Sequence, residues 1–186
     1  DMASELGAQC LTVCVGGVIE GSHSISDSLK EASSIIFEVA QFSEGSSVDL
    51  AVEPLHPVYA GNRSCLVTVR DALDMCENIG HPSVKIAVDV YHVWWDLSLA
   101  SELKRAASGQ IAGYHLCDWL ADTQDVLLDR GMMGDGVADL KNIRRAVEEA
   151  GFSGYCEVEI FSVNNWWQRE PSQVLDTCVE RFRTVC

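Results

Sequence analysis

Positive charge, proline and long apolar runs are scarce in this 186-residue chain. Its 13 basic side chains face 28 acidic ones, so the formal net charge is −15, and it has only four prolines. Such an acidic surface repels a phosphate backbone, which excludes nucleic-acid binding through a basic face. No apolar run approaches the roughly 20 residues that span a bilayer, and no signal peptide is visible. We therefore expect a cytoplasmic protein without nucleic-acid or membrane partners.

The eight cysteines form no CxxC pair and no zinc-finger spacing. Several of them, such as Cys10 and Cys117, lie inside apolar runs, where a thiol behaves as a small hydrophobe. We predict reduced thiols rather than a disulfide framework. The hydrophobic share of 47% excludes a disordered acidic chain.

Short β-branched runs alternate with stretches of helical periodicity. The runs cover residues 10–15, 48–52, 84–90, 111–116 and 155–161. The helical stretches cover residues 26–42, 64–79, 97–107, 139–150 and 171–185, and residues 2–8 resemble the end of a further helix. This alternation predicts an α/β fold of βα repeats around a parallel sheet. We expect residues 1–186 to form a single domain.

Ionisable residues stand at the ends of four successive predicted strands: Glu53, Asp89, His115, and then Glu157 and Glu159. Such groups are costly inside apolar strands unless they are paired or bind a metal. Ligands of parallel α/β folds bind at the carboxyl ends of the strands. The oxygen-rich set favours Mn²⁺, Mg²⁺ or Co²⁺, with Zn²⁺ as a possibility. Taken singly, an Asp here is more often a helix cap and a His a core residue.

All five tryptophans follow predicted strands, at positions 94, 95, 119, 166 and 167. They predict an aromatic wall beside the carboxylates, which suits the apolar faces of a sugar or cyclitol. The alternative is that they cover the end of the barrel as core residues, and both roles remain open.

Four motifs stand in a fixed order: Glu53-Pro54-Leu55, Asp89-x-x-His92, His115 with the later segment 130–136, and the segment 157–161. Together they resemble the sugar phosphate isomerase/epimerase superfamily, the xylose isomerase-like TIM barrels, over nearly the whole chain. By this resemblance the metal ligands are Glu53, Asp89, His115 and Glu159. Glu159 is preferred to Glu157 because it occupies the family's Glu-x-Phe position.

The resemblance also implies residues that contact substrate: His56, His92, Arg130, Trp94 and Trp119. It implies that Glu53 and Glu159 act as acid and base on opposite faces of a substrate that reacts through an enediolate. We therefore expect a metal-dependent isomerase or epimerase of a small sugar, sugar phosphate or cyclitol. The alternatives are an inosose-type dehydratase and an inactive truncated barrel that only binds metal or assembles. Tyr59 and His56 depart from the ketose 3-epimerase pattern of Glu and Asn, which disfavours that specific activity.

The ligand order corresponds to strands four to eight of the family barrel, with the first three βα units missing. Five strands leave an incomplete TIM barrel with open edges, from which we expect a homo-oligomer through the exposed edges. Around Arg130, we predict a mobile glycine-rich loop at Gly131, Gly134 and Gly136. For Asp118 and Asp122 we favour helix-cap roles, with support of the site residues as the alternative.

Overall fold

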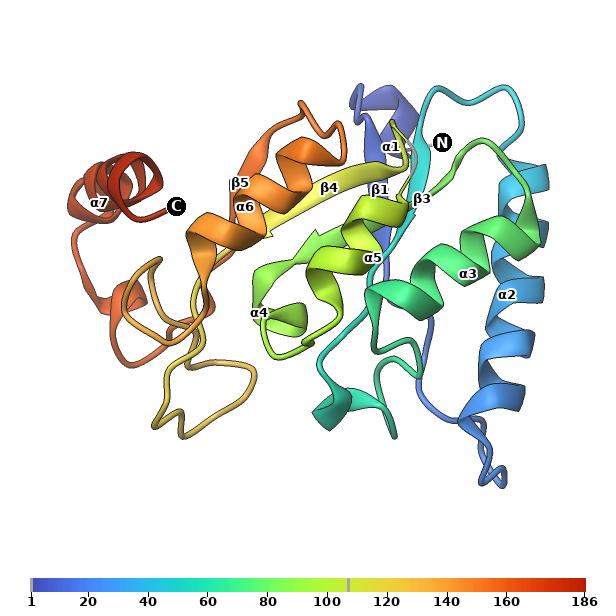
Figure 1. Ribbon diagram of the computed structural model, residues 1–186, viewed down its shortest axis with the longest axis horizontal. Helices are drawn as coiled ribbons and strands as arrows, with labels where there is room; N and C mark the ends of the chain where they lie inside the picture. The colour runs from blue at the N-terminus through green and yellow to red at the C-terminus, as the bar shows by residue number, and fades with distance from the viewer. Residues whose placement is uncertain (1, 107) are drawn as a thin grey trace.

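The computed structural model describes residues 2–106 and 108–186 as alternating strands and helices (Figure 1). The strands are β1 (Cys10–Val13), β2 (Asp49–Val52), β3 (Val84–Asp89), β4 (Ile111–Leu116) and β5 (Cys156–Val158). The helices are α1 (Met2–Glu5), α2 (Ile25–Phe42), α3 (Val69–Ile79), α4 (Val90–Val93), α5 (Leu99–Arg105), α6 (Leu140–Glu149) and α7 (Pro171–Thr184). Two 3₁₀ turns are η1 (Pro57–Tyr59) and η2 (Trp166–Gln168).

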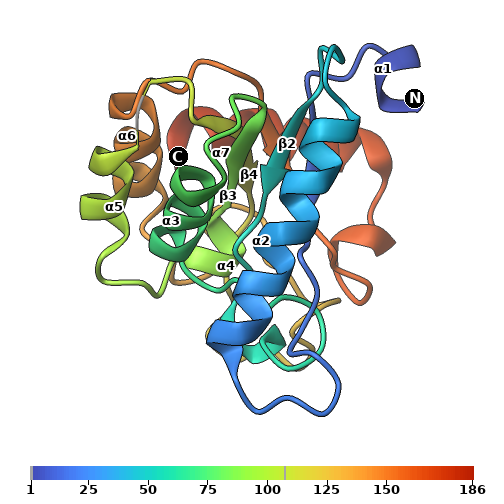
Figure 2. The same ribbon diagram turned by 90° about the vertical axis from the view of Figure 1, so that its right-hand side faces the viewer.

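The strands form one parallel sheet in the order β1-β2-β3-β4-β5. The sheet is strongly curled: the Cys10 thiol of β1 lies 3.5 Å from the carbonyl oxygen of Ala112 in β4, although two strands stand between β1 and β4 in the order. Helices α2, α3, α5 and α6 lie along one side of the sheet (Figures 1 and 2). The predicted α/β fold, an incomplete TIM barrel of five strands, is confirmed.

The main core lies between the sheet and these helices. Leu73 of α3 and Ile86 and Val88 of β3 are fully buried there. Ile86 and Val88 are two residues apart on β3, so their side chains lie on the same face of the sheet. Their burial, at about 25 cal/mol per Å² of apolar surface, is what holds the helix layer on the sheet.

Several predicted boundaries are wrong, and local capping explains two of them. The helix predicted from residue 64 begins at Val69, because the Thr68 hydroxyl accepts the Asp71 N–H at 3.1 Å. The third strand ends at Asp89 rather than at residue 90, because the Asp89 carboxylate caps α4.

Several other elements are shorter than predicted, whereas β4 has the predicted bounds and α2 begins one residue earlier, at Ile25. Strand β1 ends at Val13 and β5 at Val158, and α1 ends at Glu5. Helix α5 runs from Leu99 to Arg105, and the predicted end at Ala107 lies outside the described residues.

Both edges of the sheet expose apolar side chains. Leu11 on β1 is 49% exposed and Tyr155 beside β5 is 79% exposed. Helix α7 has no buried residue.

Within the described residues, no helix combines the length and apolarity needed to cross a membrane. All eight cysteines are free thiols.

Candidate metal centre

The parallel sheet brings the four predicted ligands to one end of the strands. The register of β3 and β4 places Asp89 directly beside His115. Glu53 follows β2, where its N–H bonds to the Val13 carbonyl at 3.0 Å. Glu159 follows β5 and extends the ladder through an N–H···O bond of 3.0 Å to Leu116.

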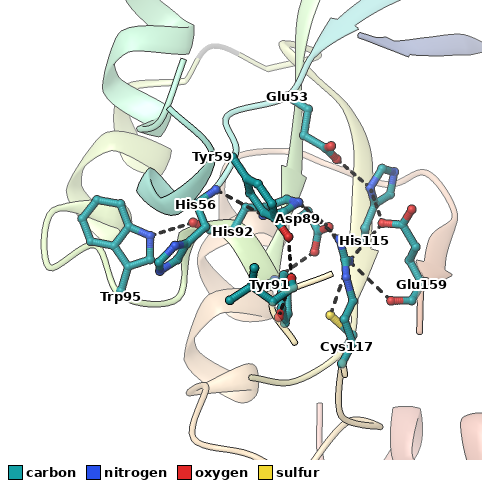
Figure 3. Close-up of polar contacts among 12 residues, drawn as sticks. Glu53, His56, Tyr59, Asp89, Tyr91, His92, Trp95, His115, Cys117 and Glu159 are labelled. Carbon is teal, nitrogen blue, oxygen red and sulfur yellow. Dashed lines mark hydrogen bonds and ion pairs between the residues drawn. The ribbon is translucent and has the colours of Figure 1, made fainter. Parts of the chain in front are cut away.

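The side chains converge on one another (Figure 3). His115 Nδ1 lies 2.9 Å from Glu53 Oε1 and 3.8 Å from Glu159 Oε2. Ligand atoms of Glu53, Asp89 and His92 lie within 4.8 Å of one another, as do those of Asp89, His115 and Glu159. Asp89 therefore joins two overlapping groups that contain all four predicted ligands.

The donor set fits a divalent cation. Glu53 and His115 are 6% and 8% exposed. Although Glu53 Oε1 and His115 Nδ1 lie close together, neither atom forms a hydrogen bond of acceptable geometry. Buried polar atoms without hydrogen bonds are costly unless a cation satisfies them. Three carboxylates with one imidazole suit Mn²⁺, Mg²⁺, Co²⁺ or Zn²⁺.

The pKa values of the cluster reflect burial and close charges. Burial raises the pKa of Glu53 and of Glu159. Burial alone would lower the pKa of His115, but the Glu53 and Asp89 carboxylates outweigh it and raise that pKa to about 9. For Asp89, burial opposes ionisation, yet Arg130 and the histidines lower its pKa. The raised pKa of His115 thus reflects the negative charge that the surrounding carboxylates concentrate in the cluster.

Arg130 enters this cluster from the loop after β4. Its Nη1 lies 2.8 Å from Asp89 Oδ2 and 3.1 Å from Glu159 Oε2. The guanidinium lies 4.3 Å from the ring centroid of Tyr91 and 5.1 Å from that of Phe161. Arg130 was expected to contact substrate, and the structure places it against two of the predicted metal ligands.

His92 and His56 are linked through the backbone. The His56 N–H donates to His92 Nδ1 at 3.2 Å, and Arg130 Nη2 lies 3.3 Å from His92 Nε2. Burial lowers the pKa of His92 to about 4, which keeps the ring neutral. Its Nε2 lies 3.6 Å from Asp89 Oδ2, beside the metal ligands.

An aromatic cluster adjoins the centre. The His56 ring stacks on Trp119, with centroids 4.6 Å apart. Trp119 also packs against Tyr91 at 4.7 Å and Trp94 at 5.8 Å. Of the five tryptophans predicted to form the wall, Trp94 and Trp119 therefore lie together. Trp166 is instead buried and donates its indole N–H to Asp135 at 2.9 Å, and Trp167 is exposed.

Asp118 has a role that the sequence did not suggest. The N-cap of α6 is Asp139, so the predicted cap role of Asp118 is wrong. The buried Asp118 carboxylate accepts the N–H groups of Gly134, Gly136 and Ala138 at 2.9–3.0 Å. A Cβ at Gly136 would lie 2.1 Å from the Trp119 oxygen, so only glycine fits. Asp118 thereby anchors the loop that follows Arg130.

A second anchor lies on the other side of Arg130. The hydroxyls of Tyr59 and Tyr91 both donate to the carbonyl of Val126, at 2.5 and 3.0 Å. Tyr59 thus holds the loop before Arg130. No pattern in the sequence links Val126 to either tyrosine.

The xylose isomerase-like TIM barrel family model matches residues 1–182, so the chain belongs to this family. Curated relatives include an inosose isomerase of Bacillus velezensis, 28% identical over 71% of this chain and 46% of its own length. A fructoselysine 3-epimerase of Escherichia coli O157:H7 is 24% identical over 100% of this chain and 63% of its length. The chain therefore spans about half to two thirds of the curated relatives it matches.

Solved structures resemble this one closely. Protein SMc04130 of Sinorhizobium meliloti 1021 is 51% identical, with a TM-score of 0.93 over 99% of this chain and 67% of that one. A zinc-bound IolI protein shares the fold, with 21% identity and a TM-score of 0.81 over 98% of this chain and 64% of its own.

Proposed function

We propose that the protein acts as a divalent-metal-dependent isomerase or epimerase on a small sugar, sugar phosphate or cyclitol. The observation that carries the proposal is the buried pair of Glu53 Oε1 and His115 Nδ1, 2.9 Å apart and both without a hydrogen bond. The isomerase and epimerase among the curated relatives support the reaction class. The oxygen-rich donor set favours Mn²⁺, Mg²⁺ or Co²⁺, and the zinc-bound IolI neighbour supports Zn²⁺ as the alternative.

Glu53, Asp89, His115 and Glu159 would hold the ion. When bound, it supplies the positive charge that stabilises negative charge developing on a substrate oxygen. Glu53 and Glu159 follow strands β2 and β5, on either side of Asp89 and His115 in the sheet order. From these positions one carboxylate accepts the proton from the carbon next to the carbonyl, and the other returns a proton.

Other residues bind and orient the substrate. The neutral His92 ring, with Nε2 beside Asp89, would hydrogen-bond a substrate hydroxyl, and Arg130 lies on the same side of the cluster. Trp119 and Trp94, with the stacked ring of His56, pack against the apolar face of a ring-shaped substrate.

We also propose that residues 1–186 form one domain whose open edges, β1 and β5, pair with another copy of the chain. The exposed apolar side chains at both edges support this assembly. The free thiols support a reducing, cytoplasmic location.

Hydrogen exchange at carbon tests the activity. The Mn²⁺-loaded protein is incubated in D₂O with inosose and a panel of ketoses, and deuterium next to the carbonyl is followed by NMR. Loss of one acid/base carboxylate should slow exchange by about 100-fold or more in Glu53→Gln and Glu159→Gln. The matched control is Glu157→Gln, because Glu157 is exposed on β5, two residues before Glu159.

Two results would redirect the proposal. Loss of water with a new carbonyl chromophore would identify the inosose-type dehydratase. A metal-loaded protein that exchanges no substrate proton would contradict the enzymatic proposal and leave the inactive metal-binding barrel.

A further inference from the structure

The charges of the metal centre do not balance within its ligand set. Glu53, Asp89 and Glu159 contribute three negative charges when ionised, and His115 is neutral when it binds a metal. The Arg130 guanidinium forms ion pairs with Asp89 and Glu159. With this one positive charge, the centre carries two net negative charges, which one divalent ion neutralises.

We propose that Arg130 sets the charge of the centre and so makes it selective for a divalent over a trivalent cation. The inference rests on the proposed metal site and adds a second role to an arginine expected to contact substrate. Arg130 is a positioning residue here, since it acts through the Asp89 and Glu159 carboxylates.

The guanidinium is held as a fixed charge. Arg130 is 4% exposed, and it lies over the Tyr91 and Phe161 rings, 4.3 and 5.1 Å from their centroids. The backbone N–H of Arg130 donates to the Phe161 carbonyl at 2.8 Å. The next residue, Gly131, forms a two-way backbone bridge with Asp118, at 2.9 and 3.0 Å.

The position of Arg130 also leaves the carboxylates able to bind a cation. Each carboxylate has two oxygens with two lone pairs each, and Nη1 contacts one oxygen of Asp89 and one of Glu159. The other Asp89 oxygen accepts the Tyr91 N–H at 2.9 Å, which fixes the orientation of that carboxylate.

Repulsion from a buried fixed cation grows with the charge of the ion. In a partly buried site, an additional unit charge a few ångströms away changes binding by well over tenfold. A centre without Arg130 would carry three net negative charges and should prefer an ion of charge three. Lanthanides suit the test, because they are hard cations that bind carboxylate oxygens.

The test measures the ratio of the affinities for Tb³⁺ and Mn²⁺ by calorimetry with the two ions in competition, and it needs no substrate. In Arg130→Gln and Arg130→Met the ratio should move toward Tb³⁺ by about tenfold or more. Arg130→Lys keeps the positive charge, so its ratio of affinities for Tb³⁺ and Mn²⁺ should stay within about threefold of the wild-type ratio. The control Arg105→Met removes a cation paired with Asp74 on the surface and should leave the ratio unchanged.

An unchanged ratio in both Arg130→Gln and Arg130→Met, or an equal shift in Arg130→Lys, would overturn the charge-setting role. These results would leave the metal site itself intact. If the wild type bound neither ion, the proposed metal centre would fail together with this inference.

Discussion

His115 Nδ1 and Glu53 Oε1 lie 2.9 Å apart in the buried centre of the half-barrel, and neither atom forms a hydrogen bond. The two residues come from the ends of β4 and β2, and Asp89 is the last residue of β3, the strand between them. A cation between these side chains would satisfy both atoms at once.

Metal binding should stabilise the fold. Mn²⁺ at 100 times its dissociation constant adds about 2.7 kcal/mol to the free energy of unfolding, because only the folded state assembles the ligands. Thermal unfolding should show the rise in Tm, and EDTA should reverse it. Glu53→Gln should abolish the rise and Glu157→Gln should keep it; equal rises in both variants would place the ion elsewhere.

Asp118 should be a major determinant of stability. Asp118→Ala leaves three loop N–H groups, those of Gly134, Gly136 and Ala138, without their carboxylate, so we expect a loss of about 2–4 kcal/mol. Urea unfolding measures this loss. The exposed Asp122 gives a matched control, since Asp122→Ala should stay within about 0.5 kcal/mol of the wild type. Similar losses in both variants would argue against the anchoring role.

Tyr59 and Tyr91 should act non-additively, because both hydroxyls donate to the Val126 carbonyl. Either Tyr→Phe substitution leaves that oxygen with one donor, so each should lower the free energy of unfolding by about 1 kcal/mol or less. The double variant leaves it without these donors and should cost more than the sum of the single variants. A double-mutant cycle in urea gives the coupling energy, and strict additivity would refute the shared acceptor.

Self-association through the sheet edges should depend on Leu11. A lysine at this exposed position of β1 places charge on the edge and should weaken pairing. Light scattering over a concentration series should show a lower mass for Leu11→Lys than for the wild type. Leu97→Lys is the control, because Leu97 is fully exposed in the segment before α5. A monomeric wild type would contradict this assembly.

The alternation of apolar runs and helical stretches was enough to predict an α/β fold with a parallel sheet, because parallel βα units repeat a local pattern. The barrel itself was predicted from the family resemblance. The points at which helices and strands begin and end depended on single capping residues. Asp89 illustrates the limit: its side chain both caps α4 and faces the cluster, and only the folded chain shows the two roles. Thr68 likewise ends a loop that the apolar periodicity had assigned to a helix.

The predicted ligands could be located because strand register brings successive strand ends together, as with Asp89 and His115. The contacts that anchor the loop on either side of Arg130 could not be predicted from the sequence. The Asp118 carboxylate meets N–H groups up to 20 residues away, and Tyr59 meets a carbonyl 67 residues away. Such contacts depend on loop conformation, which leaves no periodic signal in a single sequence.

Anomalous diffraction from crystals soaked in Mn²⁺ tests the metal centre most directly. We predict one strong manganese peak, with a carboxylate oxygen of Glu53, Asp89 and Glu159 and a ring nitrogen of His115 as its protein ligands. A peak bound by other residues, or no peak at this cluster with the ion in excess, would contradict the account.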